Sequence, residues 1–573
     1  MTIPDNDKMN RSIPPERIIS RGGSEYKGTS AVFLLSLLLL VLLLFSGTFS
    51  LSAAAQSTEI PAEDVQSEEE LIIMPPVAQE EYTVTVTECI TDGSDVMVSV
   101  AGESVTGGDD GLYHLIARYP WENVEQGREV CCEKAGEETV FIFPLNLDSE
   151  ESRLQCSFTV MVRMDNMLFP VSRSVCITNP EGAADSTRPR LESGKKGLLP
   201  EASILRSGDL SRLGIQQCLY NVPLSNFLTG GGFRYRYNGR DYEFSSETLR
   251  QYDLVVPYLH RQGIQITFVI LNNLIDDYSV LHPMSRGGWG RYYAFNTSEE
   301  EGEQKLEALV SFLAERYSGK GRGTVDNWII GNEINARTDW HYIALYDVES
   351  HAAEYERAFR IFYNIIKSAN ANANVYISID QQWTHTNSAG SFSSRSFLDA
   401  FNEAVKKRGN IDWRVAMHPY NFPMTEVRVW APSQRILHDF DTPNISMQNI
   451  DVLTDYLTQE HFLSPSGEVR TVLCSEVGYT STGGEMLQAA AVVYAYEQAM
   501  SNRFIDGLIL SREVDDYSEM AMGLHYGLIT PELEGKLAHG FYRRLATNQE
   551  AACIGAAESI MGAGKLADML TVR

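Results

Sequence analysis

From residue 195 onward, short apolar runs alternate with longer stretches in which apolar residues recur every three to four positions. The short runs have the length of buried strands, and the longer stretches have the period of helices that cover one face of a sheet. Eight such units follow one another, which predicts a (β/α)8 TIM barrel over residues 195–573. Its strands are expected at 195–199, 215–222, 264–271, 325–331, 375–380, 413–417, 471–475 and 507–511.

A different pattern fills residues 82–178. Apolar and polar residues alternate there in short runs, which Gly, Asp and Asn separate. This period of two predicts a small all-β domain of the sandwich type. Such a domain acts as a spacer or binds carbohydrate, and no motif decides between the two. The flanking segments, 56–81 and 179–194, are rich in charged residues and proline and are predicted to be linkers, the first of them acidic.

The N-terminal segment carries an apolar run over residues 31–45, interrupted only by Ser36. Basic residues precede the run and the alanines 53–55 follow it, which is the order of a secretion signal. Extended through residue 51, the run just reaches the ~20 residues of a membrane span. Residues 1–55 are therefore predicted to engage the export machinery or the membrane, as a cleaved signal peptide or as an anchor. Either way the rest of the chain is expected to be extracellular, secreted or anchored to the cell membrane.

The composition narrows the choice of partners. The 573 residues include 47 basic and 76 acidic ones, a formal charge of −29. Such a surface repels phosphate backbones, so nucleic acid is not expected as a partner, whereas neutral polysaccharides remain compatible. The eight cysteines have no spacing typical of a metal site. Pairing within residues 89–176 stays open, while Cys218 and Cys474 are expected to pack as core thiols.

Two glutamates stand directly after predicted strands. Glu333 follows the fourth strand and Glu476 follows the seventh. In a barrel of this kind the active site lies at the C-terminal ends of the strands, so both side chains are expected at the same mouth. For either residue alone, a chance charged residue at a strand end or a structural ion pair remains an alternative. Together they favour glycosidic cleavage, which needs one carboxyl group as acid and a second as nucleophile or stabiliser.

The surrounding residues resemble a known group of enzymes. Asn332-Glu333 after the fourth strand, His418-Pro419-Tyr420 after the sixth and Glu476 after the seventh are similar to the retaining clan A glycoside hydrolases, and to a bacterial family of uncharacterised barrels within that clan. The resemblance covers about residues 195–547. It implies that Glu333 is the general acid/base and Glu476 the nucleophile. It further implies that Asn332 binds the sugar 2-hydroxyl, that Tyr420 binds the nucleophile and that His418 lines the same wall, without metal or organic cofactor.

The sequence departs from that clan at two strand ends. Asn221 stands where many members have Arg, and Arg512 lies where many have Trp after the eighth strand. Arg512 is expected either to meet an anionic sugar or to pair with Glu513 or Asp515. In the loops, Trp289 and Trp383 are candidates for stacking on sugar rings, with plain loop packing as the alternative.

These observations predict hydrolysis of O-glycosidic bonds in an extracellular polysaccharide or glycan, with retention of configuration. A transglycosidase uses the same residues and stays open. The alternative from another class is a cell-surface protein that binds glycans without cleaving them. The sugar, the linkage and the oligomeric state are not determined by the sequence.

Overall fold

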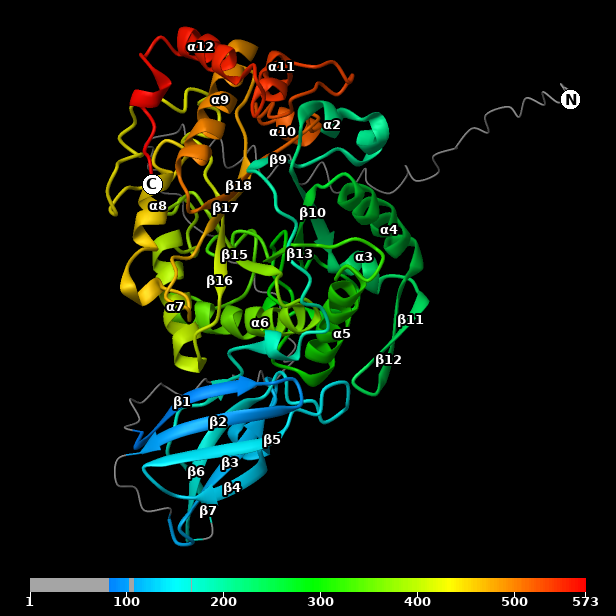
Figure 1. The fold of residues 1–573 in the computed structure, drawn as a ribbon, viewed down its shortest axis with the longest axis vertical. Coiled ribbons are helices and arrows are strands. Elements are labelled where there is room, and N and C mark those ends of the chain that lie inside the picture. Colours follow the sequence, from blue (N-terminus) through cyan, green and yellow to red (C-terminus); the bar gives the residue numbers. More distant parts are fainter. Residues whose placement is uncertain (1–81, 103–107, 166) are drawn as a thin grey trace, which may run out of the picture. The chain divides into compact units, whose positions relative to one another are not determined.

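The computed structural model describes residues 82–102, 108–165 and 167–573. Its larger part is a closed barrel of eight parallel strands (Figure 1), which confirms the predicted (β/α)8 architecture. Each strand pairs with the next along the chain, and β18 pairs with β9 to close the ring. The strands are β9 (Lys196–Leu198), β10 (Gln217–Pro223), β13 (Gln265–Leu271), β14 (Asn327–Ile330), β15 (Asn374–Asp380), β16 (Trp413–His418), β17 (Val472–Val477) and β18 (Ile505–Leu510).

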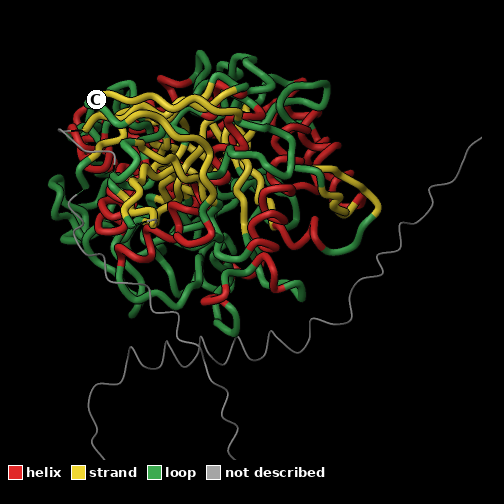
Figure 2. Tube along the Cα trace, turned by 90° about the horizontal axis from the view of Figure 1, so that it is seen from below, coloured by secondary structure: helices red, strands yellow, loops and turns green. Residues whose placement is uncertain are grey.

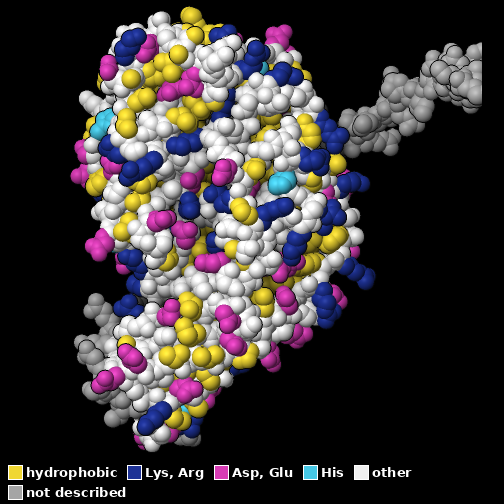
Figure 3. Space-filling view, viewed as in Figure 1, with side chains coloured by type: hydrophobic (Ala, Val, Ile, Leu, Met, Phe, Trp, Pro, Cys, Tyr) yellow, Lys and Arg dark blue, Asp and Glu magenta, His cyan; other side chains and the backbone are white. Residues whose placement is uncertain are grey.

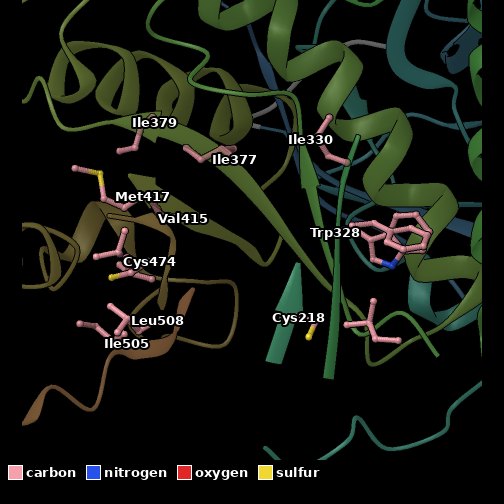
Figure 4. Close-up of a cluster of buried hydrophobic side chains, with 14 of the residues drawn as sticks. Cys218, Trp328, Ile330, Ile377, Ile379, Val415, Met417, Cys474, Ile505 and Leu508 are labelled. Carbon is pink, nitrogen blue, oxygen red and sulfur yellow. The ribbon is translucent and has the colours of Figure 1, made fainter. Parts of the chain in front are cut away.

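Helices surround this ring and bury its outer face. Outward side chains such as Cys218 of β10, Trp328 of β14 and Cys474 of β17 are buried in one continuous apolar cluster (Figure 4). Both cysteines therefore pack as core thiols, as expected. The longer helices are α4 (Ser246–Arg261), α5 (Glu300–Arg316), α6 (Val348–Ala369), α7 (Ser394–Arg408), α9 (Glu485–Ser501), α11 (Leu537–Arg544) and α12 (Glu550–Met561).

The inside of the barrel is filled in layers, because alternate residues of each strand point inward. The middle layer is apolar and includes Leu219, Ile329, Tyr376, Leu473 and Ile509. Below it, at the N-terminal ends of the strands, lie polar residues of β10, β13, β14, β15 and β18. Above it, the inward positions carry polar residues, among them Ser378, Asp380 and His418. The barrel is therefore a packed core with one polar layer at each end.

The region before the barrel is an all-β domain of two facing sheets. A three-stranded sheet in the order β1-β2-β5 faces a five-stranded one in which β4-β3-β6-β7 follow one another and β8 pairs with β6. Side chains of both sheets, among them Val98, Phe143 and Phe158, form one buried cluster, as in a sandwich. The strands are β1 (Val84–Thr91), β2 (Asp95–Gly102), β3 (Leu112–Arg118), β4 (Arg128–Lys134), β5 (Glu138–Pro144), β6 (Ser157–Met164), β7 (Met167–Pro170) and β8 (Val175–Cys176).

This β domain contacts helix α6 of the barrel. The side-chain amide of Asn364 donates to the carbonyl oxygen of Leu154 at 3.0 Å, and Gln155 donates to that of Ile361. All eight cysteines are free thiols, including Cys176, which accepts a hydrogen bond from Arg408. Acidic and basic side chains are interspersed over the face drawn in Figure 3, so the excess negative charge is not gathered there in one patch.

Several connections are long, as the green segments of Figure 2 show. One of them contains an antiparallel hairpin that is not among the elements predicted from the sequence, β11 (Gly232–Tyr237) and β12 (Arg240–Ser245). It lies between the short helix α3 (Leu224–Leu228) and α4, and the two-residue turn Asn238-Gly239 joins its strands. On its apolar side, the rings of Phe233, Tyr235 and Phe244 pack around Phe312 of α5.

The predicted signal or anchor (1–55) and the acidic linker (56–81) lie outside the described residues. Among the helices of the described part, none combines the length and the apolar character needed to cross a membrane.

Candidate active site

A tight turn after β14 places Glu333. Gly331 and Glu333 both have a positive φ, +79° and +41°, a conformation that is uncommon for a residue other than glycine. The turn is fixed against β15, because the backbone N–H of Glu333 donates to Ser378 Oγ at 3.0 Å and that of Ile334 to the Ser378 carbonyl at 2.9 Å. A strained residue that is held in this way is typical of functional sites.

A β-bulge in β17 places Glu476. Cys474 and Val477 pair with Leu508 and Leu510 of β18, so three steps on β17 match two on its neighbour. In a regular strand Glu476 would share the outward face of Cys474. The extra residue reverses this alternation and directs the Glu476 carboxylate to the inside of the barrel, where it accepts a hydrogen bond from Tyr420 at 3.1 Å.

The two carboxylates meet at one imidazole ring. His418 Nδ1 lies 2.8 Å from Glu333 Oε1 and 3.8 Å from Glu476 Oε2. Both distances are measured from the same nitrogen. Glu333 Oε1 and Glu476 Oε2 can therefore be at most about 6.6 Å apart, the sum of the two distances. Side chains that are 143 positions apart along the chain (476 minus 333) thus converge at the C-terminal end of the barrel.

The surroundings of Glu333 and His418 shift the pKa values of both side chains. Burial raises the pKa of Glu333 to about 7; the negative charges of Asp380 and Glu476 add to the shift and the hydrogen bond with His418 opposes it. Burial alone would lower the pKa of His418, but the carboxylates of Glu476 and Glu333 raise it to about 9. Near neutral pH, His418 is therefore a cation while Glu333 can still hold a proton.

A second ring of polar groups supports the turn. Asp380 accepts hydrogen bonds from Asn335 Nδ2 at 2.8 Å and from Ser394 Oγ at 3.1 Å, and its backbone N–H donates to Asn335 Oδ1 at 3.1 Å. Sequence analysis missed Asp380, Ser378 and Asn335. The signal was present: Ser378 and Asp380 are polar residues at two successive inward positions of a strand that is otherwise apolar or buried.

Three further candidates lie at the same end of the barrel. Asn332 is 8% exposed and immediately precedes Glu333. Tyr420 is buried beneath Tyr526, whose ring stacks on it at 5.6 Å between centroids. Asn221 is exposed near the end of β10. It stands two residues after Leu219, so its side chain points to the inside of the barrel as that of Leu219 does. The structure therefore places Asn332, Tyr420 and Asn221 with the two glutamates at the C-terminal end of the barrel.

The remaining candidates are placed differently from the expectation. Arg512 forms an ion pair with Glu519 and lies 3.9 Å from Asp516, whereas the expected partners were Glu513 and Asp515. Trp383 is fully buried and donates through Nε1 to the carbonyl of Phe440 at 2.9 Å, so its ring packs in the core. Trp289 is 93% exposed in the loop after β13. Of the two tryptophans, only Trp289 presents a free ring face.

No group of three or more His, Cys, Asp or Glu side chains in the described ranges is arranged to hold a metal ion.

Residues 188–569 match the protein family described as "Family of unknown function (DUF5722)". The chain belongs to this family. A search of curated proteins finds no match. The matched range contains the whole barrel and every candidate site residue, so the glutamate pair is a feature of the family domain in this chain and not of the β domain before it.

Solved structures similar to this DUF5722 chain include glycoside hydrolases. A family 39 enzyme from Bacteroides cellulosilyticus WH2 has a TM-score of 0.42 at 14% identity, over 82% of this chain and 83% of that one. The β-glucosidase of Thermotoga maritima in complex with deoxynojirimycin scores 0.39 at 12% identity, over 60% and 86%. A GH5_18 variant from Streptomyces cattleya in complex with Manb1-4GlcNAc scores 0.40 at 12% identity, over 62% and 82%. Scores this low carry no argument about an activity of this chain.

Proposed function

We propose that this protein hydrolyses O-glycosidic bonds in a polysaccharide or glycan, by a retaining mechanism with two glutamates. The observation that carries the proposal is the convergence of Glu333 and Glu476 on His418 at the C-terminal end of the barrel. A carboxyl group that keeps its proton near neutral pH, beside a second carboxylate, is the arrangement that glycosidic cleavage requires.

The spacing of the carboxylates favours retention. Retaining enzymes hold the two groups ~5–5.5 Å apart, and inverting enzymes ~6.5–9.5 Å apart so that a water molecule fits between. The upper bound of about 6.6 Å between Glu333 Oε1 and Glu476 Oε2 reaches only the lower edge of the inverting range. Direct attack by a carboxylate on the anomeric carbon therefore fits this site better than attack by an interposed water.

In the first step Glu333 donates its proton to the glycosidic oxygen while a Glu476 carboxylate oxygen attacks the anomeric carbon. The C–O bond to the leaving sugar breaks and a glycosyl ester forms on Glu476. In the second step the Glu333 carboxylate takes a proton from water, and this water displaces Glu476 from the same carbon. Two inversions give net retention. The hydrogen bond from Tyr420 orients Glu476, and His418 orients Glu333.

We extend the proposal to the location of the reaction and to the acceptor of its second step. We expect the reaction to take place outside the cytoplasm, because the N-terminal apolar run has the order of an export signal. An acceptor sugar in place of water in the second step would make the protein a transglycosidase. Direct analysis of the product distinguishes the two outcomes.

The test is to incubate the full chain with a panel of oligosaccharides and to follow the anomeric form of the first product by NMR. A product that keeps its configuration is expected. A 2-deoxy-2-fluoro glycoside that matches the cleaved sugar should label Glu476, as found by peptide mass spectrometry. Inversion of the product, or a label on another residue, would contradict the assigned roles.

The matched control is Glu497→Gln. Burial raises the pKa of Glu497 to about 7 as well, but this residue lies on α9, away from the inside of the barrel. Turnover should survive this change and should be lost in Glu476→Gln. If Glu476→Gln keeps full turnover on every substrate, Glu476 is not the nucleophile and the proposed mechanism fails. If the unmodified chain cleaves no substrate of the panel, binding without cleavage becomes the better explanation.

A further inference from the structure

Three cavities surround the hairpin β11–β12, away from the candidate active site. They have volumes of about 600, 680 and 610 Å³, each in the size range of a ligand pocket. The first shares Tyr237 and Asn238 with the second, and Arg240 and Tyr242 with the third, so the three adjoin one another along the hairpin. We call the three together the hairpin groove. None of the described residues that line it belongs to the candidate active site.

One wall of the hairpin groove comes from the β domain and offers an aromatic surface. The rings of Tyr119 and Trp121 stack in parallel, with 4.7 Å between centroids and 3° between planes. Arg128 covers Tyr119, lying 5.3 Å from its centroid, and is paired with the buried Glu122. Glu122 also accepts a hydrogen bond from the backbone N–H of Tyr119 at 2.8 Å. The platform is therefore held rigid before any ligand binds, which lowers the entropic cost of binding.

The opposite wall comes from the barrel. Tyr237 and Tyr242 of the hairpin face the groove together with Gln304 and Glu307 of α5. The hydroxyl of Tyr237 donates to Glu307 at 2.7 Å, and the Arg240 guanidinium bonds Gln304 and Glu300. Aromatic rings that alternate with amide, carboxylate and guanidinium groups match a sugar chain, which presents both apolar ring faces and hydroxyl groups.

The charge of the lining limits the ligand. The first cavity is lined by six glutamates and three arginines, and no lysine or aspartate is among its lining residues. This excess of negative charge repels polyanions such as nucleic acids and uronic acid polymers. A neutral polymer is not repelled by this charge. A peptide would need an apolar anchor pocket, whereas most of the residues that line the first cavity are polar or charged.

We infer that the hairpin groove binds a neutral polysaccharide chain at a site separate from the glutamate pair. Through this groove the β domain and the barrel together hold a polymer, with Trp121 as its stacking surface on one wall and Gln304 as a hydrogen-bonding group on the other. Binding there does not require the barrel to be a hydrolase, so this inference stands or falls independently of the proposed function.

The test is native gel electrophoresis of the full chain with Glu476→Gln as background, in gels containing barley β-glucan, galactomannan, xyloglucan or polygalacturonate. At least one neutral polymer should retard the protein, and polygalacturonate should not. Trp121→Ala should weaken the retardation about tenfold, by loss of the stacking face, and Gln304→Ala should weaken it about threefold. Phe169→Ala is the matched control, since Phe169 is an aromatic residue of the same domain that is exposed on β7 outside the groove.

Two results would overturn the inference: no retardation by any neutral polymer, or the same retardation in Trp121→Ala and Gln304→Ala as in the background. Circular dichroism spectra and melting temperatures of the variants separate loss of binding from loss of folding. If the protein with Glu476 intact cleaves none of these polymers but Trp121→Ala loses binding, the groove stands and none of these polymers is a substrate of the proposed hydrolysis. If cleavage is observed while Trp121→Ala binds unchanged, the hydrolysis stands and the groove fails.

Discussion

The two ends of the barrel are both polar, but they are built differently. At the N-terminal end, Asp506 accepts hydrogen bonds from Thr471 Oγ1 at 2.5 Å and Tyr376 at 2.8 Å, and Arg414 lies 3.6 Å away. At the C-terminal end, Glu333, Glu476 and the nearby Asp380 are grouped around a single imidazole, that of His418. The first end balances its charge, whereas the second concentrates negative charge.

This difference separates stabilising groups from reactive ones. A partly buried carboxylate with enough donors and a nearby guanidinium, such as Asp506, stabilises the fold, because its charge is compensated. At the C-terminal end burial and excess carboxylates act together, and the pKa of Glu333 rises to about 7. A carboxyl group in that state is prepared to release and take up a proton. Mutations at the two ends should therefore separate activity from stability.

The largest expected effect comes from Glu333→Gln. Loss of the general acid should lower kcat by ~10²–10⁴-fold on natural glycosides. The loss of kcat should be far smaller on an aryl glycoside with a good leaving group, because that bond breaks without protonation. Steady-state kinetics on a matched pair of substrates would check this. An equal loss on both substrates would contradict the role of Glu333 as acid.

At the opposite end, Asp506→Ala should affect stability instead. It leaves Arg414, Tyr376 and Thr471 without their common acceptor, at a cost of about 2–4 kcal/mol in the free energy of unfolding. Chemical denaturation would measure this, and kcat of the folded protein should stay within about threefold. The control Asp241→Ala breaks an exposed pair with Arg236 and should cost less than about 0.5 kcal/mol. A large fall in kcat for Asp506→Ala would mean that the two ends are coupled.

A smaller effect is expected in the pH dependence. In the unmodified protein kcat/KM should fall as the pH rises through about 7, because Glu333 then loses the proton that it donates. His418 lowers the pKa of Glu333, so His418→Gln should raise that pKa and move the alkaline limb to higher pH, by about one unit. His539→Gln removes a histidine that also contacts a carboxylate, Asp209, outside the site, and should leave the limb in place. A limb that moves to lower pH would contradict the assignment.

The sequence predicted the barrel well, because most of its strands are apolar segments of the expected length between helix-period stretches. The exception is β9, a three-residue strand that begins with Lys196 and has only a weak apolar pattern. It also located Glu333 and Glu476, because each directly follows such a segment. It could not predict the β-bulge that turns Glu476 inward, since a one-residue change of pairing depends on β18 and leaves no local pattern. Nor could it distinguish Trp383 from Trp289: both lie in loops, and only tertiary packing buries the first and exposes the second.

The hairpin was missed although its signal is local. Phe233, Tyr235 and Tyr237 alternate with arginines, and Asn238-Gly239 follows them, which is the pattern of a hairpin with a two-residue turn. The contacts of its aromatic side chains with Phe312, about seventy to eighty positions further along the chain, leave no such local signal. The two strands were therefore predictable from the sequence, whereas their packing on α5 and the hairpin groove were not.

The smallest effect tests how tightly the C-terminal end is held. Ser378→Ala removes the acceptor of the Glu333 backbone N–H, while the hydrogen bond from Ile334 to the Ser378 carbonyl remains. The turn should loosen without opening, so stability should fall by about 1 kcal/mol and kcat by about threefold to tenfold, with KM nearly unchanged. The control Ser285→Ala removes a buried hydrogen bond to the Tyr342 carbonyl at similar cost in stability but should leave kcat unchanged. If both variants lose stability alike and neither loses activity, the strained turn at Glu333 does not position the acid, and the contrast between the two ends rests on charge alone.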